Sequence, residues 1–214
     1  MDADHSPTSA SRGYGGISAA ERRTQRRAAL LETALDLLAE AGAHAVTKRA
    51  VCARARLNDR YFYEQFTDTD ALIRVLGEDL TAQGLQAAMA ATLTAGPDIR
   101  TQIHAGVAAS FDFLLSEPRR SALLRESHTN DVLFRSRVRT QHAIAKTIVA
   151  VRGDLTAEPE ADQQDGEMTA YVVIAGVFEL ISAWFRGEFD TTKEQMVELV
   201  TRMLMESSVQ TNHS

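Results

Sequence analysis

Helical spacing of apolar residues is the feature that most restricts how this chain can fold. From about Ala20, leucines and alanines recur three and four positions apart, and no segment sustains the period-two alternation of a half-buried strand. The clearest stripe contains Leu30, Leu31, Ala34, Leu35, Leu37 and Leu38. We therefore predict an all-α protein with about nine helices.

Helix-capping residues predict where several of these helices begin and end. Gly42 follows the first stripe as a C-terminal stop, and Thr47 and Asn58 are suitable N-caps for two short helices. Thr67, with Asp70 three positions later, resembles a capping box that opens a longer helix. These signals predict three helices before residue 67 and a long fourth helix after it.

Polar segments divide the remainder of the chain. Met1 to Ser18 is rich in Ser, Gly, Asp and Ala, so we expect a disordered tail there. The acidic stretch from Gly153 to Gly166 is expected to be a surface linker. The helices expected after residue 95 cover 98–116, 119–128, 131–151, 167–186 and 192–206.

Composition is that of a globular protein. With 214 residues, 44% of them hydrophobic and 24% charged, the chain can bury a sizeable core. No apolar run reaches the roughly 18 residues of a membrane span, and the first twenty residues lack the apolar stretch of a signal peptide. Cys52 is the only cysteine, which excludes an internal disulfide and favours a reducing compartment. We therefore expect a cytoplasmic protein without a membrane partner.

Charge is distributed unevenly along the chain. The formal net charge of −6 argues by itself against a nucleic-acid partner. From Glu21 to Phe66, however, nine Lys or Arg residues stand against six Asp or Glu, whereas the remainder carries 14 basic and 23 acidic residues. The local surplus of positive charge supports contact with a polyanion.

The decapeptide Leu57–Phe66, LNDRYFYEQF, is too polar for a core segment and too aromatic for a solvent-exposed loop. Phe62 and Phe66 lie four positions apart, so both are expected to face inward. Asp59, Arg60 and Tyr63 are then left on or near the outward face. In helix-turn-helix proteins the second helix of the motif enters the major groove, where its N-terminal residues meet base edges. We predict that this segment is such a reading helix.

A family resemblance rests on the residues around this decapeptide. Val46 to Leu72, VTKRAVCARARLNDRYFYEQFTDTDAL, resembles the DNA-binding signature of the TetR (tetracycline-repressor-like) family of bacterial regulators. The similar positions are Thr47, Val51, Ala55, Leu57, Phe62, Tyr63, Phe66, Ala71 and Leu72. After the tail at 1–19, the resemblance implies a helix-turn-helix DNA-binding domain over 20–68 and a helical effector-binding and dimerisation domain over 69–210.

Eight residues are candidates for contact with double-stranded DNA: Thr47, Lys48, Asn58, Asp59, Arg60, Tyr61, Tyr63 and Thr69. Arg can pair bidentately with guanine, and Asp can accept a hydrogen bond from the amino group of cytosine. Tyrosine hydroxyls and residues that open a helix suit phosphate. The alternatives are core packing for the tyrosines, a favourable interaction with the helix dipole for Asp59, and a solvated position for Arg60.

The chain departs from the family pattern at three positions. The turn glycine common in the family is Arg56, a small residue early in the reading helix is Arg60, and the lysine that often contacts phosphate is Thr69. A left-handed conformation at Arg56 would cost roughly 1 kcal/mol. Upstream, the four arginines within Arg22–Arg27 either approach a flanking groove or form a solvated basic face.

Patterns of catalysis or metal binding are weak. No glycine-rich phosphate loop follows a strand and no nucleophile elbow occurs, so neither an enzyme nor a cofactor is expected. His104, His128 and His142 lie on different expected helices, without the short spacing of a metal site. Cys52 is expected to be a small buried residue rather than a redox sensor.

The last two expected helices are candidates for a homodimer interface. Apolar residues surround 167–186 and recur along 192–206: Val172, Val173, Ala175, Gly176, Phe178, Leu180, Ile181, Ala183, Trp184, Met196, Val197, Leu199, Val200, Met203 and Leu204. One short reading helix covers too few base pairs for useful specificity, so a second copy is expected, and the resemblance implies a four-helix bundle. The alternative is that these faces are buried within one subunit.

The resemblance also implies a small effector among the central helices. Candidate contacts are His104, Phe111, Leu114, Leu124, His128, Phe134 and Gln141. The implied function is a dimeric repressor that a small apolar or amphipathic molecule releases from a palindromic operator. Alternatives are a ligand-independent regulator with a filled core, or an all-α enzyme or small-ligand carrier.

Overall fold

The fold is helical throughout the residues that the computed structural model describes, 18–156 and 160–209. The helices are α1 (Ala19–Ala41), the 3-10 turn η1 (Ala43–Ala45), α2 (Lys48–Ala55), α3 (Asp59–Tyr63), α4 (Thr69–Thr94), α5 (Ile99–Leu115), α6 (Pro118–Glu126), α7 (Asp131–Thr156), α8 (Glu160–Phe185) and α9 (Lys193–Val209). The predicted all-α class is confirmed. Of the predicted disordered tail, residues 1–17 lie outside the described range.

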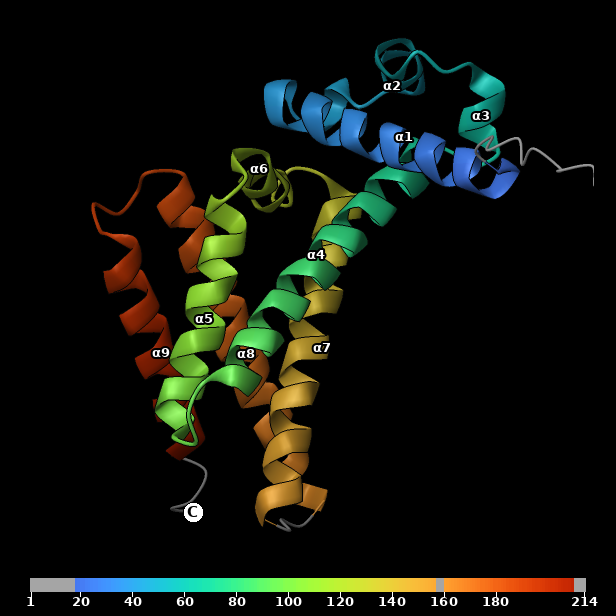
Figure 1. Ribbon diagram of the computed structural model, residues 1–214. Coiled ribbons are helices and arrows are strands. Elements are labelled where there is room, and N and C mark those ends of the chain that lie inside the picture. The colour runs from blue at the N-terminus through green and yellow to red at the C-terminus, as the bar shows by residue number, and fades with distance from the viewer. Residues whose placement is uncertain (1–17, 157–159, 210–214) are drawn as a thin grey trace, which may run out of the picture.

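The long helix α1 and the short helices α2 and α3 form a head at one end of the molecule (Figure 1). α1 lies across the top of the other helices, and α2 and α3 pack on α1 and on each other. α4 starts beneath this head and runs diagonally away from it, packing on α5 and α7. α8 packs on α7, and α9 packs on α5, so the last two helices lie far from α3.

Caps fix the ends of the head helices. Ser18 opens α1 with a capping box, in which its hydroxyl accepts from the Glu21 amide at 3.1 Å. α1 ends at Gly42, whose φ of 83° suits glycine, as predicted. Thr47 and Asn58 cap α2 and α3 by accepting backbone hydrogen bonds three residues on, which confirms both predicted N-caps.

The predicted start of α4 was wrong by one residue. Asp68, rather than Thr67, is the N-cap, and its Oδ1 accepts from the Ala71 amide at 2.7 Å. The Thr67 hydroxyl instead donates to Asp68 Oδ2 at 3.2 Å. A carboxylate suits this place because it satisfies a free amide and also interacts favourably with the helix dipole.

The predicted linker between Gly153 and Gly166 was also wrong. α7 continues to Thr156 and α8 already begins at Glu160, which leaves only residues 157–159 outside the description. Glu, Ala, Gln and Asp are compatible with a helix, and a helix end beyond the core needs no apolar stripe to signal it. Gly166 is buried, and a Cβ there would make an ordinary van der Waals contact with Val149 of α7 at 3.7 Å, so α7 and α8 pack against each other at this point.

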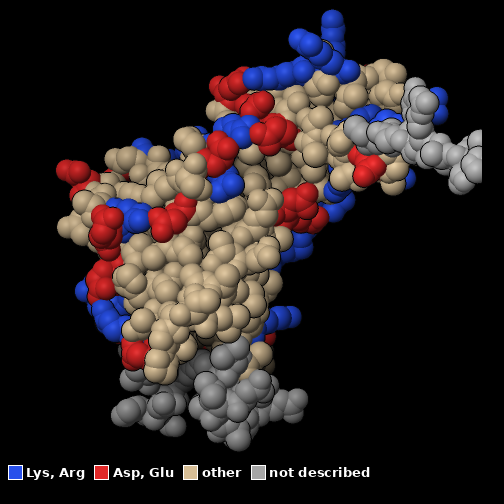
Figure 2. Space-filling model, in the orientation of Figure 1, with Lys and Arg blue, Asp and Glu red and all other residues tan. Residues whose placement is uncertain are grey.

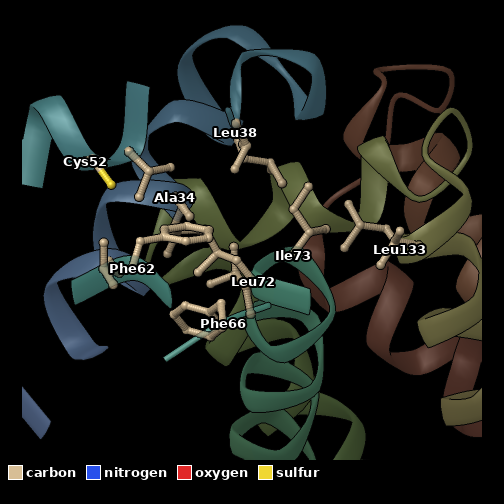
Figure 3. Packing of buried hydrophobic residues seen from close by; sticks show 14 of the residues in the cluster. Ala34, Leu38, Cys52, Phe62, Phe66, Leu72, Ile73 and Leu133 are labelled. Carbon is tan, nitrogen blue, oxygen red and sulfur yellow. The ribbon is translucent and has the colours of Figure 1, made fainter. Parts of the chain in front are cut away.

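The first core cluster joins the head to the helices below it (Figure 3). Phe62 and Phe66 pack beside Leu72 and Ile73 of α4, and the cluster continues to Leu133 of α7. α4 and α7 approach closely at Gly77, where a Cβ would lie 3.4 Å from Leu133. Packing is therefore continuous across residue 68, the domain boundary that the sequence predicted.

The second core cluster lies between α5, α8 and α9. Its buried members are Phe111, Val177, Ile181, Met196, Val197 and Val200. Phe111 is 1% exposed, and its ring centroid lies 5.7 Å from that of Trp184 in an edge-on arrangement. Such aromatic pairs add to the stabilisation from burial alone, so this cluster ties the C-terminal helices to α5.

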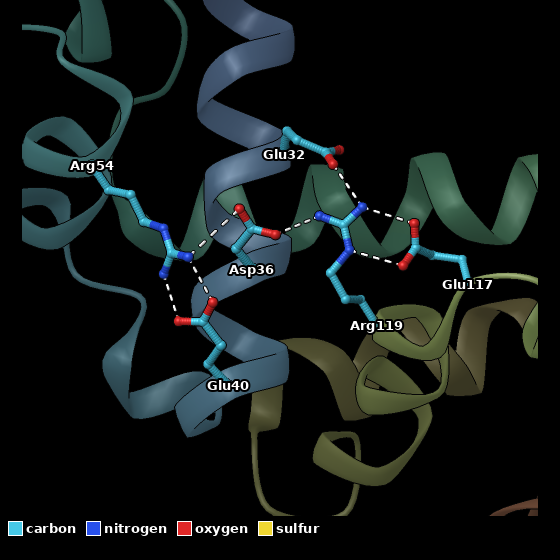
Figure 4. Close-up of polar contacts among 6 residues, drawn as sticks. All are labelled: Glu32, Asp36, Glu40, Arg54, Glu117 and Arg119. Carbon is cyan, nitrogen blue, oxygen red and sulfur yellow. Dashed lines mark hydrogen bonds and ion pairs between the residues drawn. The ribbon is translucent and has the colours of Figure 1, made fainter.

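An ion-pair network fixes α1 against α6 (Figure 4). Arg119 of α6 binds Glu32 at 2.7 Å and Glu117 at 2.8 Å, and it also pairs with Asp36. Arg54 of α2 lies 3.9 Å from the other oxygen of Asp36. These contacts raise the pKa of the Arg119 guanidinium, because hydrogen bonds to three carboxylates favour its charged form.

Two further contacts extend this network. Arg54 donates to both oxygens of Glu40 at 2.6 Å, which lowers the pKa of that carboxyl group. At the opposite end of α6, Glu126 accepts from the Ala43 amide at 2.8 Å. One end of α6 therefore binds the C-terminal half of α1 and the other end binds η1, so the head has a defined orientation on the rest of the chain.

α8 carries the most apolar sequence in the described part of the chain. Gln164–Phe185 has a mean hydropathy of 1.7 and is, by length and composition alone, able to cross a membrane. The expectation that no segment reaches this length was wrong, because Glu179 is the only charged residue between Met168 and Phe185. Core helices pass the same test, so this helix does not indicate a membrane protein.

Candidate nucleic-acid interface

The reading helix α3 has one buried side and one exposed side. Phe62 is fully buried and Phe66 is 3% exposed, with ring centroids 5.9 Å apart, so the predicted inward orientation of both is confirmed. On the other side, Tyr63 is 59% exposed and the Arg60 side chain is 83% exposed. A helix of five residues is unstable alone, so burial of the two phenylalanines is what holds it.

Arg56 adopts the left-handed conformation in the turn before α3. Its φ and ψ are 54° and 39°, and its amide donates to the Ala53 carbonyl at 3.3 Å. Arg56, at the position where the family commonly has glycine, therefore adopts the left-handed conformation that glycine adopts freely. For a non-glycine residue this backbone conformation costs about 1 kcal/mol. The Arg56 side chain is exposed one step before Leu57, close to the reading helix.

Lys48, Asp59 and Tyr63 form a polar cluster between α2 and α3. Lys48 Nζ lies 2.5 Å from Asp59 Oδ2 and 3.4 Å from the Tyr63 hydroxyl. It also lies 5.0 Å from the centroid of the Tyr63 ring. Hydrogen bonds to Asp59 and then to Tyr63 raise the pKa of Lys48, so the amine stays charged at neutral pH.

The basic run of α1 supports α3 from the side. Arg26 lies 4.4 Å from the Tyr61 ring centroid and 3.7 Å from Glu64. Arg23 donates to the Glu64 carbonyl at 3.2 Å, and Arg27 lies 5.0 Å from the Phe66 ring. These three arginines therefore position the reading helix. This role differs from both alternatives predicted from the sequence, contact with a flanking groove and a solvated basic face.

The remaining candidates lie around the same edge of the head. The Thr47 hydroxyl accepts from the Ala50 amide at 3.2 Å, and Thr69 is the half-buried first residue of α4. Arg49, exposed in the first turn of α2, is a candidate that the sequence analysis missed. The signal was a second basic residue directly after Lys48. Figure 2 shows Lys and Arg side chains gathered at the outer end of the head.

The seven effector candidates are only partly brought together. Phe111, Leu114 and Leu124 share the second core cluster. Gln141 is buried in α7, whereas His104 is exposed and Phe134 is 46% exposed. His128 lies 3.4 Å from Arg137 and 3.7 Å from Glu179 of α8. Phe111, Leu114 and Leu124 thus lie in one place, whereas Phe134 and His104 lie at the surface.

The C-terminal helices show both buried and exposed apolar faces. Met196, Val197 and Val200 of α9 are buried against the subunit's own core, as the single-subunit alternative describes. On α8, Met168 is 55% exposed and Val172 is 68% exposed.

Cys52 of α2 is buried, as predicted. No group of three His, Cys, Asp or Glu side chains suited to a metal occurs among the described residues.

Comparison with known proteins identifies the architecture. Residues 30–76 match the family of bacterial regulatory proteins called the tetR family, and this range contains α2, α3 and the turn between them. Residues 30–76 therefore form a TetR-family DNA-binding domain. This domain is the one with which bacterial regulators of that family bind DNA, so the match supports a DNA-binding regulator and agrees with the exposed edge of α3.

Solved TetR-fold structures cover nearly the whole chain. A TetR-like transcriptional regulator from Rhodococcus sp. RHA1 is 16% identical, with a TM-score of 0.63 over 93% of this chain and 100% of that one. A TetR family transcription regulator from Marinobacter aquaeolei VT8 is 20% identical, with a TM-score of 0.56 over 88% and 97%. FadR from Bacillus subtilis, solved in complex with stearoyl-CoA, is 12% identical, with a TM-score of 0.59 over 83% and 96%. At these identities the similarity shows the fold.

Proposed function

We propose that this TetR-family protein is a dimeric repressor that reads a palindromic operator with α3 and leaves it when a small apolar or amphipathic molecule binds the central helices. The observation that carries the proposal is the exposed edge of α3. Arg60 and Tyr63 project from a helix that Phe62 and Phe66 hold from behind. We further propose that residues 20–68 act as the DNA-binding unit and 69–210 as the regulatory unit, in the cytoplasm.

Each exposed side chain suits a different part of the duplex. Arg60, in the first turn of α3, can donate two hydrogen bonds to guanine in the major groove. Tyr63 and Thr47 carry hydroxyl groups that suit phosphate, and Lys48 adds a positive charge beside them. Tyr61, packed under Arg26, is better placed to support the helix than to read bases.

The outward face of α8 supports a second copy. Met168 and Val172 are exposed on a helix of which only 33% of the apolar stretch is buried within the subunit. Large exposed apolar surfaces usually mark an interface, and two TetR subunits joined there would present two reading helices to successive grooves. A palindromic operator is the expected partner of such a symmetric pair.

The effector proposal rests on the apolar residues between α5, α6 and α8. Phe111, Leu114 and Leu124 already meet there, close to Trp184. FadR of Bacillus subtilis, which shares the fold, binds stearoyl-CoA. A long-chain acyl-CoA is therefore the first candidate effector to test. A ligand acts as a switch only if it binds one arrangement of the dimer more tightly than the other.

Selection from randomised duplexes tests DNA reading, symmetry and half-site spacing together. We expect a palindrome, bound with steep salt dependence. Arg60→Ala should then cost about 1–3 kcal/mol at one base position of each half-site and relax the preference there. Arg74→Ala, on the exposed face of α4, is the matched control and should leave the selected sequence unchanged. Equal affinity of the wild type for every sequence would contradict the proposal.

A thermal-shift series with stearoyl-CoA, shorter acyl-CoAs and free CoA tests the effector. Binding to the folded state should raise the Tm in a concentration-dependent manner and weaken operator binding in the same concentration range. A shift without release of DNA would favour the ligand-independent regulator. Turnover of a substrate by a variant that no longer binds DNA would favour the enzyme alternative.

A further inference from the structure

The positive charge of Lys48 is already engaged before any DNA is present. Its ammonium group lies 2.5 Å from Asp59 Oδ2, and the pair bridges the first turns of α2 and α3. The Lys48 side chain is 34% exposed and that of Asp59 is 60% exposed, so water and DNA can both reach the pair. Lys48 is therefore a phosphate-binding candidate that carries its own competing anion.

A second feature of the cluster gives Lys48 somewhere to move. The Tyr63 hydroxyl lies 3.4 Å from the same Nζ, and the ring centroid lies 5.0 Å away. A lysine ammonium on a flexible stem can rotate about such a ring while keeping a cation–π contact. Exchange of Asp59 for a phosphate oxygen thus needs rotation of one side chain and no movement of the backbone.

We propose that Asp59 is a specificity-determining residue that suppresses non-specific DNA binding by competing with phosphate for Lys48. The proposal rests on the proposed DNA-reading function and concerns how the same site selects its sequence. On a random duplex, Lys48 gains a phosphate only by leaving Asp59, and the freed carboxylate then faces the polyanion unpaired. Both effects weaken binding to any sequence that offers Asp59 no partner.

An operator with a suitable base recovers this loss. Asp59 is the first residue of α3, where side chains meet base edges, and a carboxylate can accept from the N4 amino group of cytosine. A site with cytosine at that position therefore satisfies Asp59 and frees Lys48 at once. Exposed ion pairs change an equilibrium by roughly fivefold at most, so the exchange stays reversible.

The experiment is a double-mutant cycle on DNA affinity. The wild-type dimer, Asp59→Asn, Lys48→Met and the double variant are titrated against a mixed-sequence duplex and against the site selected with the wild type, over a range of salt concentrations. Asp59→Asn should tighten mixed-sequence binding roughly three- to fivefold and steepen its salt slope by about 0.9. The selected site should gain less, so the specificity ratio falls. In the Lys48→Met background the steeper slope should not appear.

Controls separate this mechanism from a general charge effect or a folding defect. Asp79→Asn removes the same charge from an exposed position of α4 and should leave slope and ratio unchanged. If Asp59→Asn melts early, Asp59→Ala gives the same test with a better helix former. An unchanged slope in Asp59→Asn, an equal gain on both duplexes, or an equal gain with Lys48→Met would each overturn the inference. Failure of the wild type to bind any duplex would instead overturn the proposed function.

Discussion

At the scale of single residues, the head contains one position with a strained backbone and several whose capping hydrogen bonds or burial are favourable. Asn58 and Thr47 cap their helices in the expected way, and Phe62 is fully buried. Arg56, between the two short helices, adopts a left-handed backbone that L-residues avoid. The turn therefore forms because its neighbours are held by burial and capping, rather than because residue 56 favours it.

Replacing Arg56 with glycine should stabilise the protein. Relief of the left-handed strain outweighs the extra chain entropy of glycine, and we expect a gain of about 0.5–1 kcal/mol in the free energy of unfolding. Urea denaturation followed by circular dichroism measures the change. Arg56→Ala is the matched control, because it removes the same side chain but keeps an L-residue in the turn. An equal gain in both variants would show that charge, not backbone strain, is responsible.

At the scale of elements, α6 holds the head through polar contacts at both of its ends. Arg119 pairs with Glu32 and Asp36 of α1, and also with Glu117, the residue directly before α6. The Arg119 side chain is only 28% exposed, so solvent screens its attraction to the carboxylates less than it would screen a fully exposed ion pair. The orientation of the reading helix on the body thus depends on charge as well as on apolar packing.

Arg119→Met should destabilise the protein at neutral pH and much less in acid. The Arg119 guanidinium donates hydrogen bonds to Glu117 and lowers the pKa of that carboxyl group below its ordinary value of 4.5 in the folded state. A lowered folded-state pKa gives stability that is present above the unfolded pKa and lost as the pH falls through the folded value. The difference between wild type and variant should therefore narrow below pH ~4.5, the unfolded value, in urea unfolding curves.

Arg74→Met is the control for this pH series. Arg74 pairs with Glu78 within α4, at 3.1 Å, on an exposed surface. Such pairs contribute little, so this variant should follow the wild-type curve at every pH. A constant difference between wild type and Arg119→Met from pH 7 to pH 3 would mean that the loss of Arg119 acts through packing rather than through its carboxylate partners.

Elements were predictable where the signal is local. Apolar spacing predicted the helices. Thr47 and Asn58 were predicted as N-caps because each is a suitable residue type directly before a short helix. The extension of α7 to Thr156 and the start of α8 at Glu160 were missed, because polar helix ends carry no apolar stripe that would predict them. The contact between Arg119 and Asp36 spans 83 positions, and no local pattern announces it. The Lys48–Asp59 pair was missed for a similar reason, since it forms only when α2 and α3 pack.

At the scale of the whole molecule, the reading helix α3 lies in the head and α8 lies in the body, apart from it (Figure 1). The surfaces that we propose for operator binding and for pairing of subunits are therefore separate. Any signal between them must pass through α4, α6 and α7, which the first core cluster and the Arg119 network join to the head. This separation lets the two activities be tested with variants that affect one surface at a time.

Val172→Glu should separate the subunits and weaken operator binding together. The substitution places a charge in the apolar face that we propose as the dimer interface, where burial of an unpaired charge is costly. We expect a monomer in sedimentation velocity and at least a tenfold loss of affinity for the palindrome, of order 1.4 kcal/mol. Thr147→Glu, exposed on α7, should remain dimeric. A dimeric Val172→Glu protein would place the interface elsewhere.

The continuous packing from Phe62 through Leu72 to Leu133 has a practical consequence for engineering. A chimera that joins residues 20–68 to the body of another regulator would remove Phe62 and Phe66 from their own packing partners on α4. These side chains would then be exposed or would pack against unrelated residues. A successful transplant must carry the first two turns of α4 and bring matching side chains on the recipient's α7. New operator specificity is therefore more safely introduced by replacing individual outward residues of α3 than by exchanging the unit as a cassette.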